Sequence, residues 1–212
     1  MIGVFGGTFD PVHFGHLRSA LEVAEQLDLE RVLMLPCHVP PHRDRPGASP
    51  AQRRAMLEAA LAGQARLVLD SLELDRPGPS YMVDSLAALR DRYGPARPLV
   101  LILGQDAFAG LPGWHRWREI PALAHLAVMR RPGPEVPVPP ELAPLPAAAT
   151  GPAALRAAPG GKLWQGTVTA LDISATAIRA LVAEGRSPRY LVPEPVRALI
   201  ERERLYAAGA GR

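Results

Sequence analysis

Short apolar runs alternate along this chain with longer segments in which apolar residues recur every three or four positions. The apolar runs predict strands, over residues 1–5, 31–35, 67–69, 99–103, 126–129 and 163–171. The amphipathic segments predict helices, over about residues 17–27, 50–62, 82–92, 175–185 and 194–204. Strands that alternate with helices form parallel sheets covered on both faces. We therefore predict an α/β fold: a doubly wound, mostly parallel Rossmann-like sheet with helices on both faces and a small C-terminal helical part.

Polar residues at the predicted helix starts support these boundaries. Ser49 and Gln52 have the spacing of a capping box, in which each side chain bonds the backbone of the other residue. Ser80 and Ser174 stand shortly before two later helices, where a hydroxyl can accept a backbone N–H. All three serines are predicted to be N-caps.

Residues 132–161 break the alternation. This stretch is rich in proline, alanine and glycine, and it shows neither strand nor helix periodicity. We predict an extended surface connection or a poorly ordered loop. The chain is then a single domain over residues 1–212, with its C-terminal helical part over 173–212.

Composition narrows the class of protein. With 212 residues, 48% of them apolar, the chain is long enough to bury a core. Cys37 is the only cysteine, so no disulfide can form within the chain. No apolar run approaches the roughly 18 residues of a membrane span, and no signal peptide is visible. A net charge of +3 suits small anionic ligands. We expect a cytoplasmic protein without membrane or nucleic-acid partners; a homo-oligomer is left open.

The segment from Gly6 to Leu17, GGTFDPVHFGHL, joins the first predicted strand to the first predicted helix. Glycines allow a ligand to approach the backbone closely, and the first N–H groups of a helix have no partners within it. Such a junction is typical of a phosphate site. His13 and His16 add hydrogen-bond donors at the same place.

Three more polar clusters are predicted to lie near the same edge of the sheet, because parallel strands place ligands at their carboxyl ends. These clusters are residues 36–43, 104–106 and 173–179. Their histidine, arginine, hydroxyl and glycine residues suit phosphoryl or nucleotidyl transfer, which needs positioning and charge stabilisation rather than a protein nucleophile. No serine or cysteine stands beside a base in a motif that would favour acyl hydrolysis.

Each cluster also has a structural interpretation. The Gly6-Gly7 pair can be only a turn. Zinc can use the spacing of His13 and His16, or a set of Cys37, His38 and His42. The other candidates can also have purely structural roles. Asp106, Ser174 and Thr176 can be helix caps, Arg179 can be a solvated helix residue, and Trp114 and Trp117 can be core residues.

Together these motifs resemble a known family. The Gly6–His16 segment is similar to the His-x-Gly-His signature of a nucleotidyltransferase superfamily, and Ile173-Ser174-x-Thr176-x-Ile178-Arg179 is similar to its second motif. Within that superfamily the chain most resembles the bacterial nicotinate-nucleotide adenylyltransferases. Supporting motifs follow in the family's order along nearly the whole chain, at residues 40–43, 79–81, 104–106, 111–117, 130–133 and 191–196.

The resemblance implies adenylyl transfer from ATP to nicotinate mononucleotide, which gives nicotinate adenine dinucleotide and pyrophosphate in NAD biosynthesis. Mg²⁺ would assist together with ATP, and no metal-ligating residues are implied. The implied catalytic residues are His13 and His16. The implied ATP-binding residues are Gly6, Gly7, Thr8, Phe9, His13, His16, His42, Gly104, Asp106, Ile173, Ser174 and Arg179. The implied mononucleotide-binding residues are Tyr81, Met82, Trp114 and His115.

Two positions depart from the family pattern. Ala175 stands where a second serine is common, which removes one hydroxyl contact. Met82 stands where threonine is common, so backbone N–H groups alone would bind the nicotinate carboxylate.

Three other functions remain as alternatives. A sister enzyme, phosphopantetheine adenylyltransferase, shares the first motif, but the motifs around Tyr81 and Trp114 argue against it. A nucleotide-binding regulator without activity is disfavoured by the intact His13, His16 and Arg179. An RNA-binding module is disfavoured because basic residues do not cluster with aromatic ones.

Overall fold

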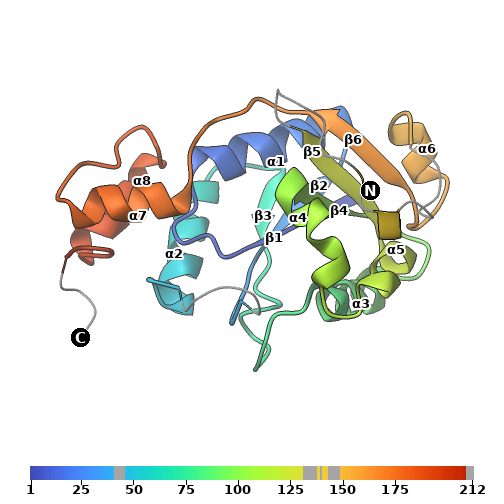
Figure 1. The fold of residues 1–212 in the computed structure, drawn as a ribbon, viewed down its shortest axis with the longest axis horizontal. Coiled ribbons are helices and arrows are strands. Elements are labelled where there is room, and N and C mark those ends of the chain that lie inside the picture. The colour runs from blue at the N-terminus through green and yellow to red at the C-terminus, as the bar shows by residue number, and fades with distance from the viewer. Residues whose placement is uncertain (41–45, 131–137, 139, 143–148, 209–212) are drawn as a thin grey trace.

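One sheet of parallel strands runs through the molecule (Figure 1). The structure is a computed structural model, and it describes residues 1–40, 46–130, 138, 140–142 and 149–208. The strands are β1 (Ile2–Gly7), β2 (Arg31–Pro36), β3 (Leu67–Leu69), β4 (Leu99–Gly104), β5 (His125–Arg130) and β6 (Leu163–Thr167). Their order across the sheet is β3-β2-β1-β4-β5-β6, and every pair is parallel. The predicted Rossmann-like α/β fold is confirmed.

Helices cover both faces of this sheet. They are α1 (Phe14–Gln26), α2 (Pro50–Leu61), α3 (Met82–Tyr93), α4 (Gln105–Ala109), α5 (Ile120–Leu123), α6 (Pro152–Arg156), α7 (Ala175–Ala183) and α8 (Glu194–Arg202). Short 3-10 helices are η1 (Leu111–Gly113), η2 (Trp117–Glu119) and η3 (Pro140–Leu142). Figure 1 shows α7 and α8 beside α2 at one end of the molecule, and α2 contacts α8.

The strands separate two apolar cores because alternate side chains point to opposite faces. In β4, Val100 and Ile102 enter the core that also contains side chains of α1 and α2. Leu99, Leu101 and Leu103 enter the other core, which contains side chains of α3 and α5. Strands buried on both faces read as continuous apolar runs, which explains why these segments were visible in the sequence.

The predicted caps of α2 and α7 are confirmed, whereas that of α3 is wrong. Ser49 Oγ accepts the N–H of Gln52, and Ser174 Oγ accepts the N–H of Ala177 at 3.1 Å. The N-cap of α3 is Tyr81, without a side-chain capping bond. Ser80 Oγ instead accepts the backbone N–H of His38 at 2.8 Å and links the start of α3 to the end of β2.

Strand β6 ends at Thr167, earlier than the predicted residue 171. The Val168 N–H still donates to Arg130 O, the last residue of β5. The next N–H, that of Thr169, donates to a carboxylate oxygen of Glu22 on α1 at 2.6 Å. A side chain of α1 therefore replaces the neighbouring strand as the hydrogen-bond partner.

The proline-rich stretch is more ordered than predicted where the structure describes it. It contains η3 and α6, and Leu142 and Leu155 are buried, with 1% and 0% of their surface exposed. Leu155 lies in the core beside α1, and Leu142 lies in the core beside α3. The prediction of an extended connection is therefore wrong for these segments, because apolar side chains anchor them to the sheet. Residues 132–137, 139 and 143–148 lie outside the described residues.

Among the helices of the described residues, none has the length and apolar character needed to cross a membrane.

Candidate active site

The site lies where the strand order reverses. From β1 the chain passes outward through β2 and β3, and from β4 it passes outward the other way through β5 and β6. Ligands of open parallel sheets bind beyond the carboxyl ends of the strands at this switch point. Gly7 ends β1 and Gly104 ends β4, so two of the predicted clusters meet here.

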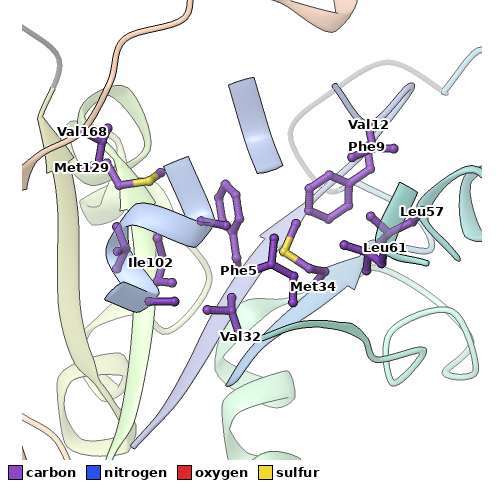
Figure 2. Close-up of a cluster of buried hydrophobic side chains, with 14 of the residues drawn as sticks. Phe5, Phe9, Val12, Val32, Met34, Leu57, Leu61, Ile102, Met129 and Val168 are labelled. Carbon is purple, nitrogen blue, oxygen red and sulfur yellow. The ribbon is translucent and has the colours of Figure 1, made fainter. Parts of the chain in front are cut away.

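Residues 6–16, hereafter the signature loop, connect β1 to α1. Phe9 has a positive φ of 49°, a conformation that few residues with a side chain adopt. Its ring and the Val12 side chain are buried and turn toward Leu57 and Leu61 of α2 (Figure 2). The packing of Phe9 and Val12 in the apolar core therefore fixes the position of the signature loop. One of the first N–H groups of α1 has a partner outside the helix, because the Phe14 N–H donates to Leu191 O at 3.1 Å.

His13 and His16 stack on one another at the start of α1. Their ring centroids are 3.7 Å apart with the planes inclined by 28°, and His16 also meets the Phe9 ring edge-on at 5.1 Å. Gly15 permits this arrangement, since a Cβ there would come within 3.0 Å of the His13 ring. The His13 backbone N–H donates to His16 Nδ1 at 3.4 Å. In neutral His16 this bond assigns the ring proton to Nε2, which can then donate to a ligand.

Asp10 connects the signature loop to three other segments. Its buried carboxylate accepts the N–H groups of Gly47 at 2.8 Å and Ala48 at 3.0 Å, and the Tyr206 hydroxyl at 2.7 Å. Burial and the Asp10 carboxylate raise the pKa of Tyr206, so the phenol keeps its proton and acts as the donor. The guanidinium of Arg179 lies 3.8 Å from the same carboxylate.

Arg179 and Ser174 bring α7 to the signature loop. Arg179 donates to the backbone carbonyl of Asp10 at 2.8 Å and keeps about a third of its side chain exposed, at 34%. The Ile173 carbonyl lies 3.5 Å from the Cβ that Gly15 lacks. The structure therefore places Ile173, Ser174 and Arg179 beside the loop, whereas His42 lies outside the described residues. We call the signature loop, Arg179 and their partners the phosphate side of the site, after the ligand group that the sequence predicts for it.

Gly104 opens space at the end of β4. A Cβ on Gly104 would meet no heavy atom within 4 Å among the described residues, and its φ of −72° needs no glycine. Asp106 follows in the first turn of α4 with its side chain exposed. The interpretation of Asp106 as the helix cap is wrong, because Gly104 is the N-cap.

The remaining predicted residues gather between α3 and η1. We call this region the mononucleotide side, after the ligand that the family resemblance implies for it. The rings of Tyr81 and His115 lie 4.2 Å apart. Trp114 directly follows η1 and is partly buried, whereas Trp117 is 9% exposed and belongs to the core. Met82 approaches the signature loop so closely that a Cβ on Gly6 would lie 2.5 Å from its terminal methyl group. Gly6 therefore allows the two sides to meet.

A buried carboxyl supports this start of α3 from behind. Ser85 Oγ donates to Glu73 Oε1 at 2.6 Å, and Arg76 donates to Ser85 Oγ at 3.2 Å and to Tyr81 O at 3.4 Å. Glu73 is 2% exposed, and burial raises its pKa. Tyr81 is thus held through its backbone as well as its ring.

Sequence reasoning missed the roles of Asp10, Tyr206 and Arg53. Asp10 was quoted only as part of the signature, and Tyr206 carries no local signal. Arg53 did carry one, because it occupies the apolar stripe of α2 with Met56, Leu57 and Leu61. Its guanidinium is fully buried and donates to Thr8 O at 2.9 Å.

Within the described ranges, no group of three or more His, Cys, Asp or Glu side chains is arranged to hold a metal ion. The zinc alternative with Cys37, His38 and His42 is not tested, because His42 lies outside those ranges. Burial raises the pKa of the Cys37 thiol, so it stays protonated.

Comparison with known proteins agrees with the fold and with the resemblance. Solved structures of Plasmodium falciparum nicotinic acid mononucleotide adenylyltransferase, complexed with NaAD or with APC, match 97% of this chain and 96% of theirs, with TM-scores of 0.74 and 0.72. At 14% identity this likeness shows the fold alone.

Sequence relatives are much more similar. Proteins named "Probable nicotinate-nucleotide adenylyltransferase" are 50% identical in Methylococcus capsulatus, over 98% of this chain and 100% of the relative, and 48% identical in Pseudomonas aeruginosa PAO1, over 98% and 97%. The sequence model of the cytidylyltransferase-like proteins matches residues 4–181. The chain belongs to the nicotinate-nucleotide adenylyltransferase family, within the cytidylyltransferase-like proteins.

Proposed function

We propose that this protein transfers the adenylyl group of ATP to nicotinate mononucleotide and releases pyrophosphate. One observation carries the proposal beyond family membership. At the switch point of the sheet, a stacked histidine pair and Arg179 stand on one side, and the Tyr81–His115 contact stands on the other. Cationic groups and hydrogen-bond donors thus lie next to an aromatic subsite. The reaction needs both, because one substrate is a triphosphate and the other is a mononucleotide with an aromatic ring.

The reaction needs no protein nucleophile. A phosphate oxygen of the mononucleotide attacks the α-phosphorus of ATP and forms the new P–O bond. The bond from the α-phosphorus to the bridging oxygen breaks, and pyrophosphate leaves with that electron pair. Negative charge grows on the phosphate oxygens in the transition state, so fixed donors accelerate the step. His13 and His16 would supply these donors, and the stacking fixes their ring planes before substrate binds.

Each remaining group has a substrate part to bind. Arg179 and the start of α7 at Ser174 would hold the β- and γ-phosphates, together with His42, whose role stays a prediction. The signature loop backbone from Gly6 to Phe9 would contact the triphosphate. Gly104 and Asp106 would hold adenosine, since a ligand can occupy the space that Gly104 leaves open.

The mononucleotide would bind on the other side of the switch point. Trp114 would stack on the pyridine ring. Backbone N–H groups near Met82 and His115 would receive the nicotinate carboxylate, because the Met82 thioether offers no hydroxyl. Mg²⁺ would arrive as part of the MgATP substrate, since this ion is commonly bound through substrate phosphates and waters.

The experiment measures pyrophosphate release by the full chain with MgATP and either nicotinate mononucleotide or its amide analogue. We expect turnover to be much faster with the acid than with the amide, because N–H donors bind a charged carboxylate more strongly than a neutral amide oxygen. Absence of turnover with either mononucleotide would contradict the proposal. Faster turnover with the amide would overturn the assignment of the carboxylate to these backbone groups.

A further inference from the structure

Arg53 is a buried cation under the signature loop. It lies on α2 with none of its surface exposed, and it faces the ends of β1 and β2. One guanidinium nitrogen donates to Thr8 O at 2.9 Å and lies 3.9 Å from Cys37 Sγ, and the other donates to His38 O at 3.2 Å. These partners are uncharged.

No carboxylate forms an ion pair with Arg53 among the described residues, and its Nε has no hydrogen-bond partner there. The neighbouring Arg54 is the opposite case, because it is about half exposed and pairs with Glu58 on the same helix. Burial of a charge without a counter-charge is strongly unfavourable. The arrangement is understandable if a ligand on the other side of the loop supplies the negative charge.

The bond to Thr8 also orients the backbone. A trans peptide group is planar and its C=O and N–H point in opposite directions. The Thr8 carbonyl points to Arg53, so the Phe9 N–H points to the opposite side of the loop. Phe9 has φ of 49°, and a hydrogen bond from a buried guanidinium helps to hold this uncommon conformation.

The positive charge of Arg53 also acts on the side of the loop to which the Phe9 N–H points. Charges in the protein interior are screened less than charges at the surface, so Arg53 raises the electrostatic potential at the loop. The loop also carries the Asp10 carboxylate, but the oppositely charged Arg179 guanidinium lies 3.8 Å from it. Because these two charges oppose each other, Arg53 leaves the three groups with a net positive charge.

We propose that Arg53 is a positioning residue for the polyphosphate subsite, in which it turns the Phe9 N–H toward the ligand and places a buried positive charge beneath the loop. The inference rests on the proposed function for the identity of the ligand. It adds a residue that touches no substrate and acts through the Thr8–Phe9 peptide.

The test compares Arg53→Met, which keeps the length but removes charge and donors, with Arg53→Lys, which keeps the charge. Arg54→Met is the matched control on the same helix. Calorimetry gives the Kd of inorganic pyrophosphate, and steady-state rates give KM for ATP and for the mononucleotide separately. We expect Arg53→Met to raise the pyrophosphate Kd and the ATP KM at least tenfold with a small change in the mononucleotide KM. Arg53→Lys should recover part of the loss, and Arg54→Met should match the wild type.

A folded Arg53→Met protein with a pyrophosphate Kd within twofold of the wild type would overturn the inference. If that variant does not fold, a nuclear magnetic resonance titration of the wild-type protein still tests the inference. Its Phe9 backbone amide resonance should shift on addition of pyrophosphate, and an unchanged resonance at saturation would contradict the inference.

The two proposals fail separately. Pyrophosphate binding that depends on Arg53, without turnover of nicotinate mononucleotide, refutes the proposed function alone. Normal turnover with unaltered pyrophosphate binding in folded Arg53 variants refutes the positioning role alone.

Discussion

On the phosphate side of the site, a buried carboxylate of the signature loop itself, that of Asp10, binds the other segments. On the mononucleotide side, the buried carboxyl of Glu73 lies behind α3, and the more exposed residues make ring contacts and surface ion pairs. Asp10 accepts bonds from Gly47, Ala48 and Tyr206, which belong to two distant segments of the chain. On the other side, the Tyr81 ring meets the His115 ring at 4.2 Å. Nearby, Arg116 and Glu119 pair at the surface, each with about half of its side chain exposed.

The difference matches two kinds of task. Donors that stabilise a developing charge must be in place before the reaction, since reorganisation during the step would cost the energy they supply. Stacking on an aromatic ring tolerates small displacements and acts mainly through buried area. Changes on the phosphate side should therefore lower kcat and stability, and changes on the mononucleotide side should mainly raise a KM.

The largest effect is expected for His16→Ala. Loss of a donor to the reacting phosphate should lower kcat by about 100-fold or more. Steady-state kinetics under saturating substrates measure the change, and thermal unfolding checks that the fold is retained. A near-normal kcat would show that His16 does not stabilise the transition state. It would also contradict the proposed difference between the two sides of the site.

Asp10→Asn should reduce stability more than Trp114→Ala on the mononucleotide side. The new amide can accept fewer of the bonds at this buried position, which we expect to cost about 2 kcal/mol in urea unfolding. Tyr206→Phe removes one donor and should cost about 1 kcal/mol. The KM for ATP should rise in both variants, because the Asp10 side chain beside Arg179 loses its charge in one and its Tyr206 bond in the other. An Asp10→Asn protein as stable as the wild type would show that this cluster does not hold the site.

Trp114→Ala should raise the mononucleotide KM about tenfold, in line with a stacking contact of roughly 1–3 kcal/mol. The ATP KM and the unfolding midpoint should change little. Trp117→Ala serves as the contrast, since loss of a core side chain should lower the unfolding midpoint first. If Trp114→Ala raised only the KM for ATP, the assignment of Trp114 to the mononucleotide side would be contradicted.

The smallest effect tests the open space at Gly104. Because a Cβ there meets nothing within 4 Å in the described protein, Gly104→Ala should leave stability unchanged and raise the ATP KM a few-fold. Gly113→Ala is matched, because its Cβ also meets nothing, and it should alter neither quantity. Equal ATP KM values for the two variants would place adenosine away from Gly104.

Local signals in the sequence predicted local structure well. The strand over 99–103 is right to within one residue because its side chains are apolar on both faces. Ser49 and Ser174 were correct caps because their partners lie three residues away.

Errors arose where the deciding partner is distant in sequence. Ser80 accepts a hydrogen bond from His38, 42 positions away. Glu22 accepts the N–H of Thr169, 147 positions away, just beyond the end of β6. The family resemblance placed the predicted site residues, but their burial and mutual contacts required the fold. Arg53 shows an intermediate case: the apolar stripe of α2 predicts its burial, and only the structure identifies Thr8 and His38 as its partners.

The bond between Asp10 and Tyr206 joins residues 196 positions apart. Ribosomes add roughly 5–20 residues per second, so Asp10 is made on the order of ten to forty seconds before its hydroxyl partner. Contacts of such long sequence separation close late, since the ends of a long loop must first find each other. A nascent chain can form β1 and much of the sheet during this interval. The completed nucleotide site is then one of the last parts of the protein to assemble.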